Sequence, residues 1–253
     1  MKSSLSFLLA LALTAAPLAS AFVVAPRAAL SAKTQLHVAT EASASVDTSA
    51  SRSEQLLAKA KDFVKTGSGF YSPPDPALFS EEFVFRGPVV GPLNKKDYLH
   101  TLGECFQVFK VFPDISANAW GFSIDPENPN KVWYMVRNTG TMENDWQLAP
   151  NLPAIPANGK KVKGPPETHS VLFDEEMKVK CLTVGYVADR FEGNTNGSGA
   201  AFGLLEGIGY KFPPLQIYRI ASELTNGLNG GPTAFSTELP EWWPHEGKLN
   251  DGM

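Results

Sequence analysis

Residues 167–188, which read ETHSVLFDEEMKVKCLTVGYVA, decide the fold class. Two stretches in this segment, 167–173 and 178–188, alternate between apolar and polar residues, as half-buried strands do. The run between them, 174–177, is polar and short enough to be a turn. The segment therefore predicts an antiparallel hairpin.

The chain before this hairpin changes from a helical to a strand pattern. Apolar residues at helical spacing predict one helix from Ser53 to about residue 66 and a second over 95–109, which Asn94 caps. Strands are predicted over 115–124 and 132–142, followed by a proline-rich loop. Helices followed by an antiparallel sheet are typical of the α+β class. After the hairpin, a further helix is predicted over about 213–224.

The first 50 residues have the pattern of targeting sequences. Lys2, an apolar run and the small residues Ala19-Ser20-Ala21 are typical of a secretory signal peptide. The next stretch to about residue 40 is basic, free of acids and rich in Ala and Ser, as transit peptides are. The junction at Phe22 resembles the presequences of plastid proteins in heterokont algae, which implies import into the plastid (chloroplast), to the stroma. Plain secretion with a propeptide is the alternative.

These patterns predict four segments. They are a signal peptide (1–21), a transit peptide and linker (22–50), an α+β domain (51–190) and a glycine-rich, helical C-terminal extension (191–253).

Composition excludes several classes of protein. The formal net charge is −4, from 22 Lys and Arg against 26 Asp and Glu, which gives no electrostatic reason to bind nucleic acid. Cys105 and Cys181 are too few for a disulfide framework. The sequence has no His, Asp or Glu cluster at metal-ligand spacing, so neither a metal nor a cofactor is expected. A second long apolar run is absent, so no membrane span is expected.

The order of several short motifs resembles the SnoaL-like proteins of the nuclear transport factor 2-like superfamily. The motifs are Phe83-Val84-Phe85-Arg86-Gly87-Pro88, Gly91, the helix over 95–109, Phe112-Pro113-Asp114, Gly140-Thr141, the run 156–162 and the hairpin around 173–179. They cover roughly residues 54–189. The resemblance implies a cone in which a strongly curved antiparallel sheet wraps the N-terminal helices and leaves a pocket at the open end.

Two residues of the hairpin are candidates for chemistry. If Lys178 and Lys180 face water, alternation places Thr183 on the inward face. On the partner strand, Glu167 and His169 then share the inward face. A carboxylate beside an imidazole can orient it as a general base. The alternative is a buried hydrogen-bond network with no role in catalysis.

Five further residues are predicted to contact a ligand. Arg137 needs a carboxylate, for which Glu167 is the expected partner, or an anionic ligand. The aromatic rings of Tyr134, Trp133 and Trp146 can pack against a ligand. Thr183 stands where the resemblance places the acid of SnoaL-like cyclases, and a threonine has no useful acid or base function, so cyclase chemistry by that route is not expected.

The resemblance and these residues together lead to three functional hypotheses. The first is a plastid pocket protein that binds a small, largely apolar molecule and isomerises or cyclises it with His169 and Glu167. The second is a non-catalytic module that binds a pigment, a lipid or a protein. The third is a scaffold that forms a homodimer. The iota-type carbonic anhydrases also resemble this fold, but only His169 remains of their histidine-rich strand motif.

Gly199, Gly203 and Gly207 recur every four residues. On a helix they form one bare face, which predicts close packing of this segment on the sheet or on a partner.

Overall fold

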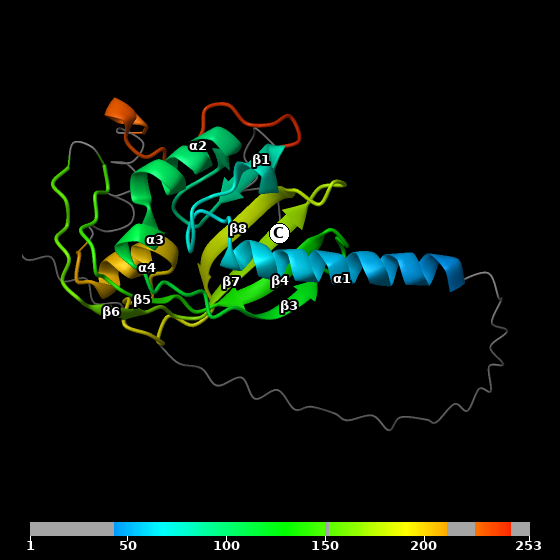
Figure 1. Ribbon diagram of the computed structural model, residues 1–253, viewed down its shortest axis with the longest axis horizontal. Helices are drawn as coiled ribbons and strands as arrows, with labels where there is room; N and C mark the ends of the chain where they lie inside the picture. The colour runs from blue at the N-terminus through cyan, green and yellow to red at the C-terminus, as the bar shows by residue number, and fades with distance from the viewer. Residues whose placement is uncertain (1–42, 150–151, 212–225, 244–253) are drawn as a thin grey trace, which may run out of the picture. The chain divides into compact units, whose positions relative to one another are not determined.

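The computed structural model describes residues 43–149, 152–211 and 226–243. The predicted signal peptide, most of the transit peptide and the helix expected over 213–224 lie outside these ranges. The described chain has an α+β architecture, in which a strongly twisted sheet carries helices on its inner face (Figure 1). The fold class therefore agrees with the sequence.

Six strands form the main sheet, in the order β2-β1-β8-β7-β4-β3. Strands β1 and β8 run parallel, and the other neighbouring pairs run antiparallel. The predicted hairpin is confirmed, because β7 and β8 pair antiparallel across the turn. The strand bounds are Phe79–Arg86 (β1), Leu93–Asn94 (β2), Trp120–Ile124 (β3), Lys131–Val136 (β4), Glu167–Phe173 (β7) and Val179–Val187 (β8).

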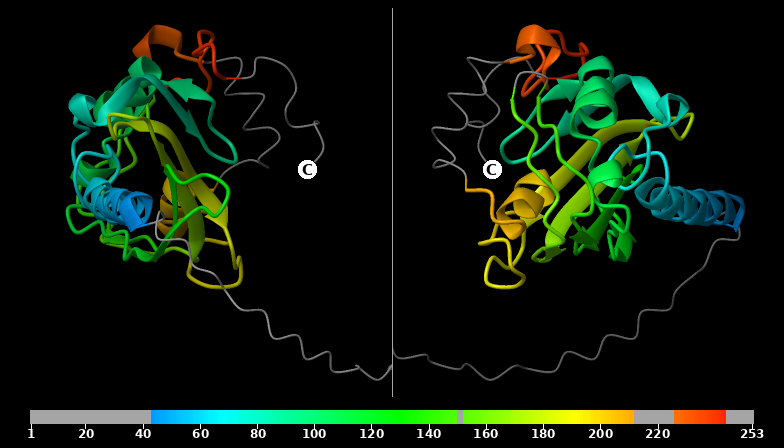
Figure 2. Two further views of the ribbon diagram at one scale, coloured as in Figure 1. Left: turned by 90° about the vertical axis from the view of Figure 1, so that its right-hand side faces the viewer. Right: turned by 60° about the vertical axis from the view of Figure 1, so that its left-hand side comes forward.

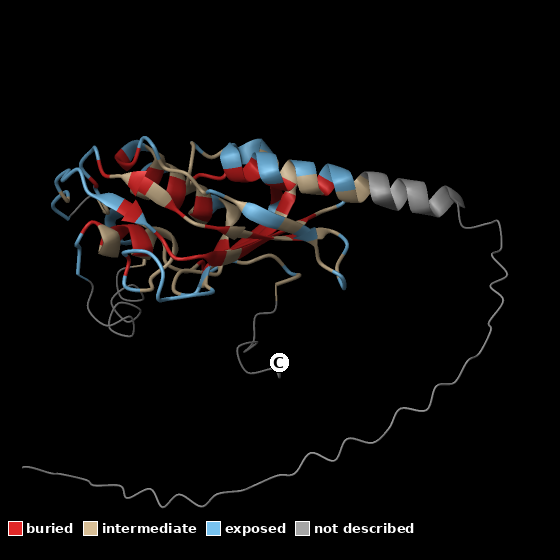
Figure 3. Cartoon of the chain, turned by 90° about the horizontal axis from the view of Figure 1, so that it is seen from below, coloured by how far each residue is buried: buried red, intermediate tan, exposed pale blue. Residues whose placement is uncertain are grey.

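The first helix, α1 (Ser43–Lys65), packs against β3 and β4. It begins ten residues before the predicted cap at Ser53, so the stretch 43–52 is helical rather than a linker. Leu56, Ala60 and Phe63 are buried at helical spacing, and Figure 3 shows this buried stripe facing the sheet, with the exposed side outward. A short helical turn, η1 (Pro76–Leu78), precedes β1.

The predicted helix over 95–109 is divided into three parts. Asn94 caps α2 (Lys95–His100), as expected, because its side chain accepts a hydrogen bond from the backbone of Asp97. The chain then widens into a π-helix, η2 (Thr101–Phe106), and Gln107 has a left-handed backbone (φ 43°) before α3 (Val108–Val111). The apolar spacing predicts that Leu99, Leu102, Phe106 and Phe109 face the core. Of these only Leu102 is buried, and Tyr98, Thr101 and Val108 are buried instead.

The strand predicted over 132–142 is also interrupted. Strand β4 ends at Val136, and after Arg137 and Asn138 the chain continues as β5 (Thr139–Thr141) in a separate two-stranded sheet with β6 (Lys161–Lys163). The strand predicted over 115–124 is shorter at its start. Asn138 lies in this break and belongs to neither strand, so strand alternation does not determine the direction of its side chain.

Helix α4 (Ala200–Gly207) lies beside β6 and, with α3, forms a second apolar core. A Cβ added at Gly207 would lie 2.6 Å from Val162 Cγ1, and one added at Gly199 would lie 3.0 Å from the Glu167 carboxyl carbon. The predicted close packing is confirmed at Gly199 and Gly207, within this chain, but Gly199 precedes the helix with an extended backbone instead of lying on its face.

The described C-terminal segment, 226–243, includes the short turn η3 (Leu228–Gly230) and runs beside α2 and β1, as the two views of Figure 2 show in orange and red. Trp242 donates its indole N–H to the Glu82 carbonyl at 2.8 Å. The C-terminal segment therefore contacts β1, a strand about 160 residues earlier in the chain.

Candidate functional site

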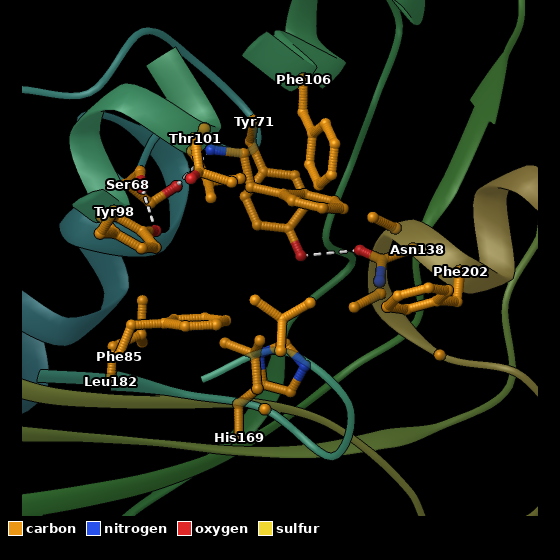
Figure 4. A pocket seen from close by; sticks show the side chains of 18 of the residues that line it. Ser68, Tyr71, Phe85, Tyr98, Thr101, Phe106, Asn138, His169, Leu182 and Phe202 are labelled. Carbon is orange, nitrogen blue, oxygen red and sulfur yellow. Dashed lines mark hydrogen bonds between the residues drawn. The ribbon is translucent and has the colours of Figure 1, made fainter. Parts of the chain in front are cut away.

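A cavity lies between the inner face of the sheet and the helices that cover it (Figure 4). Its volume is about 90 Å³, against roughly 150 Å³ for an engineered apolar cavity that binds benzene, but it is partly open to solvent. Most of its lining is apolar; the polar side chains that line it are Ser68, Tyr71, Tyr98, Thr101, Tyr134, Asn138 and His169.

Glu167 anchors the polar end of this cavity. It begins β7, and its side chain is only 1% exposed. One carboxyl oxygen, Oε1, accepts hydrogen bonds from Asn138 Nδ2 at 2.9 Å and from the backbone N–H of Ala200 at 3.0 Å. The other, Oε2, lies 3.1 Å from His169 Nε2. The carboxyl group is therefore contacted by three separate segments of the chain.

A β-bulge in β8 positions a further donor. Ser170 pairs with Thr183 and Thr168 with Tyr186, which leaves one extra residue on β8. Gly185 lies in this bulge with φ 82°, a backbone conformation that favours glycine. Its N–H, turned out of the strand ladder, donates to His169 Nε2 at 3.2 Å.

His169 Nε2 thus has two neighbours with different needs. The Gly185 N–H requires an acceptor, whereas an ionised Glu167 Oε2 requires a donor. Nε2 can accept from the Gly185 N–H or donate to an ionised Oε2, but it cannot do both at once. Within the described ranges, His169 Nδ1 has no hydrogen-bond partner, and the ring lines the cavity edge-on to Tyr134 at 5.5 Å between centroids.

Two functional residues were missed by the sequence analysis. Asn138 accepts a hydrogen bond from the Tyr71 hydroxyl at 2.7 Å through Oδ1. Burial, and then the nearby Glu167, raise the pKa of the Tyr71 phenol well above its ordinary value. Tyr71 lies in the loop between α1 and β1, where no periodicity indicates its direction. The turn-forming residues around it, over 67–76, indicated a loop but not that Tyr71 points into the protein.

Tyr71 also borders a second hollow. Together with Val64 it lines both the cavity and an open groove between α1 and the segment 115–122. These two side chains form the wall between the interior and that groove.

The predicted ligand-contacting residues divide into those that reach the cavity and those that do not. Tyr134 lines it, as expected. Trp146 is buried in the second core, where it packs on Phe112 and donates to the Phe106 carbonyl at 2.8 Å. Trp133 donates to Asp125 Oδ2 at 2.6 Å, and alternation along β4 places it on the sheet face opposite Tyr134.

Arg137 pairs with Glu192 rather than with the predicted partner Glu167. The bond comes from its Nη2, and its Nε is buried without a hydrogen-bond partner in the described structure. The side chain is not among those that line the cavity. Glu167 is instead contacted by the Asn138 side chain, the Ala200 N–H and His169.

Thr183 also lies away from the cavity. Phe173 pairs with Val179 and Leu172 with Cys181, so Lys180 is an extra residue that reverses the alternation of β8. Leu182 and Val184 consequently line the cavity, and Thr183 accepts a hydrogen bond from Arg86 Nε at 2.7 Å. The predicted inward face of β8 was correct at Val179 but wrong beyond the bulge.

Two negative findings apply to the part of the chain that the structure describes. It contains no group of three or more His, Cys, Asp or Glu side chains placed to hold a metal ion. Over the same residues, no helix is long and apolar enough to cross a membrane.

Comparison with known proteins finds similar solved structures, although no family model and no curated protein matches the chain. A putative SnoaL-like polyketide cyclase from Jannaschia sp. CCS1 is 12% identical with a TM-score of 0.39, covering 52% of this chain and 84% of its own. A phenazine biosynthesis-related protein from Pseudomonas aeruginosa is 15% identical with a TM-score of 0.37, covering 65% and 94%. A nuclear transport factor 2-like protein from Anabaena variabilis is 14% identical with a TM-score of 0.33, covering 60% and 96%. These likenesses concern the fold alone.

Proposed function

We propose that this protein binds a small, largely apolar molecule in the cavity that Tyr71 and His169 line. The observation that supports the proposal is an apolar cavity into which few, well-fixed polar groups converge, which is the usual construction of a small-molecule site. Hydrogen bonds fix the side chains of His169, Tyr71 and Tyr98 before a ligand arrives. Such pre-organisation lowers the free-energy cost of binding.

The binding test uses one-ring probes and a variant that fills the cavity. Ala201 lines the cavity from α4, and Ala58 is an exposed residue of α1. We expect toluene and phenol to bind the wild-type protein in calorimetric titrations, and Ala201→Leu to weaken their binding at least tenfold while Ala58→Leu leaves it unchanged. Absence of binding to the wild-type protein, or equal binding by both variants, would contradict the proposal.

A second candidate, proton transfer on the bound molecule, is supported by the Glu167–His169 contact at 3.1 Å. A base positioned beside a bound carbonyl compound can remove a proton from the α-carbon and return it at the γ-carbon, which shifts a double bond with no net change in composition. The class of reaction is therefore an isomerisation or a cyclisation that begins with an enol.

The activity test uses 3-cyclohexen-1-one, whose conversion to the conjugated 2-cyclohexen-1-one is followed by absorbance. We expect His169→Gln to lower the rate by about 10²-fold or more, the usual contribution of a general base. If the wild-type protein binds the one-ring probes but does not convert this compound, binding without chemistry is the function.

A further inference from the structure

The hydrogen-bond chain at the polar end of the cavity has a fixed direction. It begins at the backbone N–H of Ala200, which can only donate and which points at Glu167 Oε1 at 3.0 Å. Oε1 is therefore an acceptor, whatever the position of the proton near Oε2. The second group that contacts Oε1 at 2.9 Å, the Asn138 side chain, must donate as well.

This requirement orients the Asn138 amide. Its Nδ2 faces Glu167, so its Oδ1 faces Tyr71, 2.7 Å away. An amide oxygen only accepts, and the Tyr71 hydroxyl must therefore use its single proton toward Asn138. The oxygen of Tyr71 keeps its lone pairs for another partner.

Two observations place those lone pairs at the ligand site. Tyr71 lines the cavity, and Figure 4 shows its hydroxyl directed to the space above His169. Burial and Glu167 raise the phenol pKa, so the hydroxyl keeps its proton and the direction of the chain at neutral pH.

We propose that Tyr71 is a specificity-determining residue that selects ligands carrying an O–H or N–H donor. The inference rests on the proposed function, because it assigns the polar requirement of the same cavity. The class of ligand is an apolar ring or chain that carries an alcohol, a phenol, an enol or an amine. Ethers and halides of the same shape meet an acceptor in Tyr71 and are disfavoured, and a ketone gains this hydrogen bond only in its enol form.

Three probes of similar shape test this preference in the wild-type protein. Phenol carries a donor, fluorobenzene carries only a weak acceptor, and toluene carries neither. We expect phenol to bind roughly three- to tenfold more tightly than the other two, the effect of one net hydrogen bond. If all three bind equally, the inference is wrong while the proposed function stands. If none binds, the proposed function itself fails.

Two phenylalanine substitutions then assign the preference to one hydroxyl. Tyr71→Phe keeps the ring and removes the acceptor, so phenol should bind no better than toluene. Tyr186→Phe is the matched control, because Tyr186 is exposed on β8 and does not line the cavity. A phenol preference that persists in Tyr71→Phe, or that disappears in Tyr186→Phe, overturns the assignment. The wild-type comparison remains decisive if either variant does not fold.

Discussion

His169 is held from two sides, and this makes its substitutions informative. Replacement with alanine removes the acceptor of the Gly185 N–H and the neighbour of Glu167 Oε2, both inside the protein. A buried polar group left without a partner costs about 1–3 kcal/mol. We therefore expect His169→Ala to lower the free energy of unfolding by that amount, measured by urea denaturation.

His169→Gln provides the matched comparison. The amide of glutamine can reach a position similar to that of Nε2 and can contact both Gly185 and Glu167. This variant should retain most of the stability that alanine loses while lacking the imidazole. If the two variants are equally stable, the buried contacts of Nε2 contribute nothing, and the ring acts only by filling space.

The sequence predicted which face of the strand carries Glu167 and His169, but not the hydrogen-bond partners that other segments supply to them. Strict alternation was enough to place both on the inner face of β7. Thr183 could not be placed in the same way, because the extra residue at Lys180 reverses the side-chain direction of β8. A bulge depends on pairing with another strand, so the residues of one strand alone do not reveal it. The partner of Glu167, Asn138, depends on the break between β4 and β5 in the same way.

At the scale of elements, the turn between β3 and β4 is organised by one carboxylate. Asp125 accepts hydrogen bonds from the Trp133 indole N–H and from the backbone N–H groups of Glu127 and Asn128. The Trp133 contact, followed by the Glu127 N–H, lowers the pKa of Asp125 to about 2. A lowered pKa in the folded state means that the ionised group stabilises the fold above about pH 4, its unfolded value.

This contribution should be lost as the pH falls from about 4 to 2. We expect the stability difference between the wild-type protein and Asp125→Asn to be largest near pH 5 and to shrink toward pH 2 in thermal unfolding experiments. Glu127→Gln changes the same charge in the same turn without touching Trp133, so it serves as the control. A pH-independent difference for Asp125→Asn would show that its ionisation is not coupled to folding.

Helix α4 lies on β6 at a distance that only glycine permits. A methyl group at Gly207 would lie 2.6 and 2.8 Å from the two methyl groups of Val162, which is buried and β-branched. Overpacking of this kind costs about 1–3 kcal/mol, more than the roughly 1 kcal/mol that alanine gains over glycine in a helix. We expect Gly207→Ala to be destabilising in urea denaturation.

Val162→Ala removes the opposing methyl groups and tests the cause. In a double-mutant cycle, Gly207→Ala should become neutral or stabilising when combined with Val162→Ala. If the effects of the two substitutions simply add, contact with Val162 is not the reason for a glycine at position 207.

The second helix shows where helical periodicity stops being informative. Asn94 predicted its start correctly, but of the apolar stripe that follows only Leu102 is buried. The wider π-turn over η2 and the left-handed Gln107 were not predictable, because the intrinsic propensities of these residues do not favour a π-helix. Packing against the C-terminal segment and the second core accompanies this change, and both involve residues far along the chain.

At the scale of the whole molecule, the C-terminal segment contacts elements from the first half of the chain, namely β1 and the loop that follows it. Its backbone pairs with the loop after β1 through Gly91 N–H to the Ala234 carbonyl and Ser236 N–H to the Pro92 carbonyl, at 2.8 and 2.9 Å. Lys180 lies 5.2 Å from the ring centroid of Trp242, so the segment also reaches β8. The β1–β2 loop lines the cavity, and the cavity wall is thus supported from outside by this segment.

Ser236 is the residue through which this support can be tested. Its hydroxyl accepts a hydrogen bond from the Asn94 N–H at 2.8 Å and donates to Asp97 Oδ2 at 2.5 Å, at the N-terminal end of α2. Ser236→Ala should lower the free energy of unfolding by about 1–3 kcal/mol, because it leaves both groups without this partner. Thr237→Ala, at the exposed neighbouring position, is the control and should change stability little.

The same two variants show whether Ser236 only caps α2 or also supports the cavity wall. If the segment supports the wall, Ser236→Ala should also weaken toluene binding several-fold under conditions where the variant is fully folded, whereas Thr237→Ala should not. A loss of stability with unchanged toluene affinity would limit Ser236 to capping α2. If the two variants are equally stable, the hydrogen bonds of Ser236 to α2 do not contribute to the stability of the fold. The cavity wall is then held by the sheet and α1 without help from this contact.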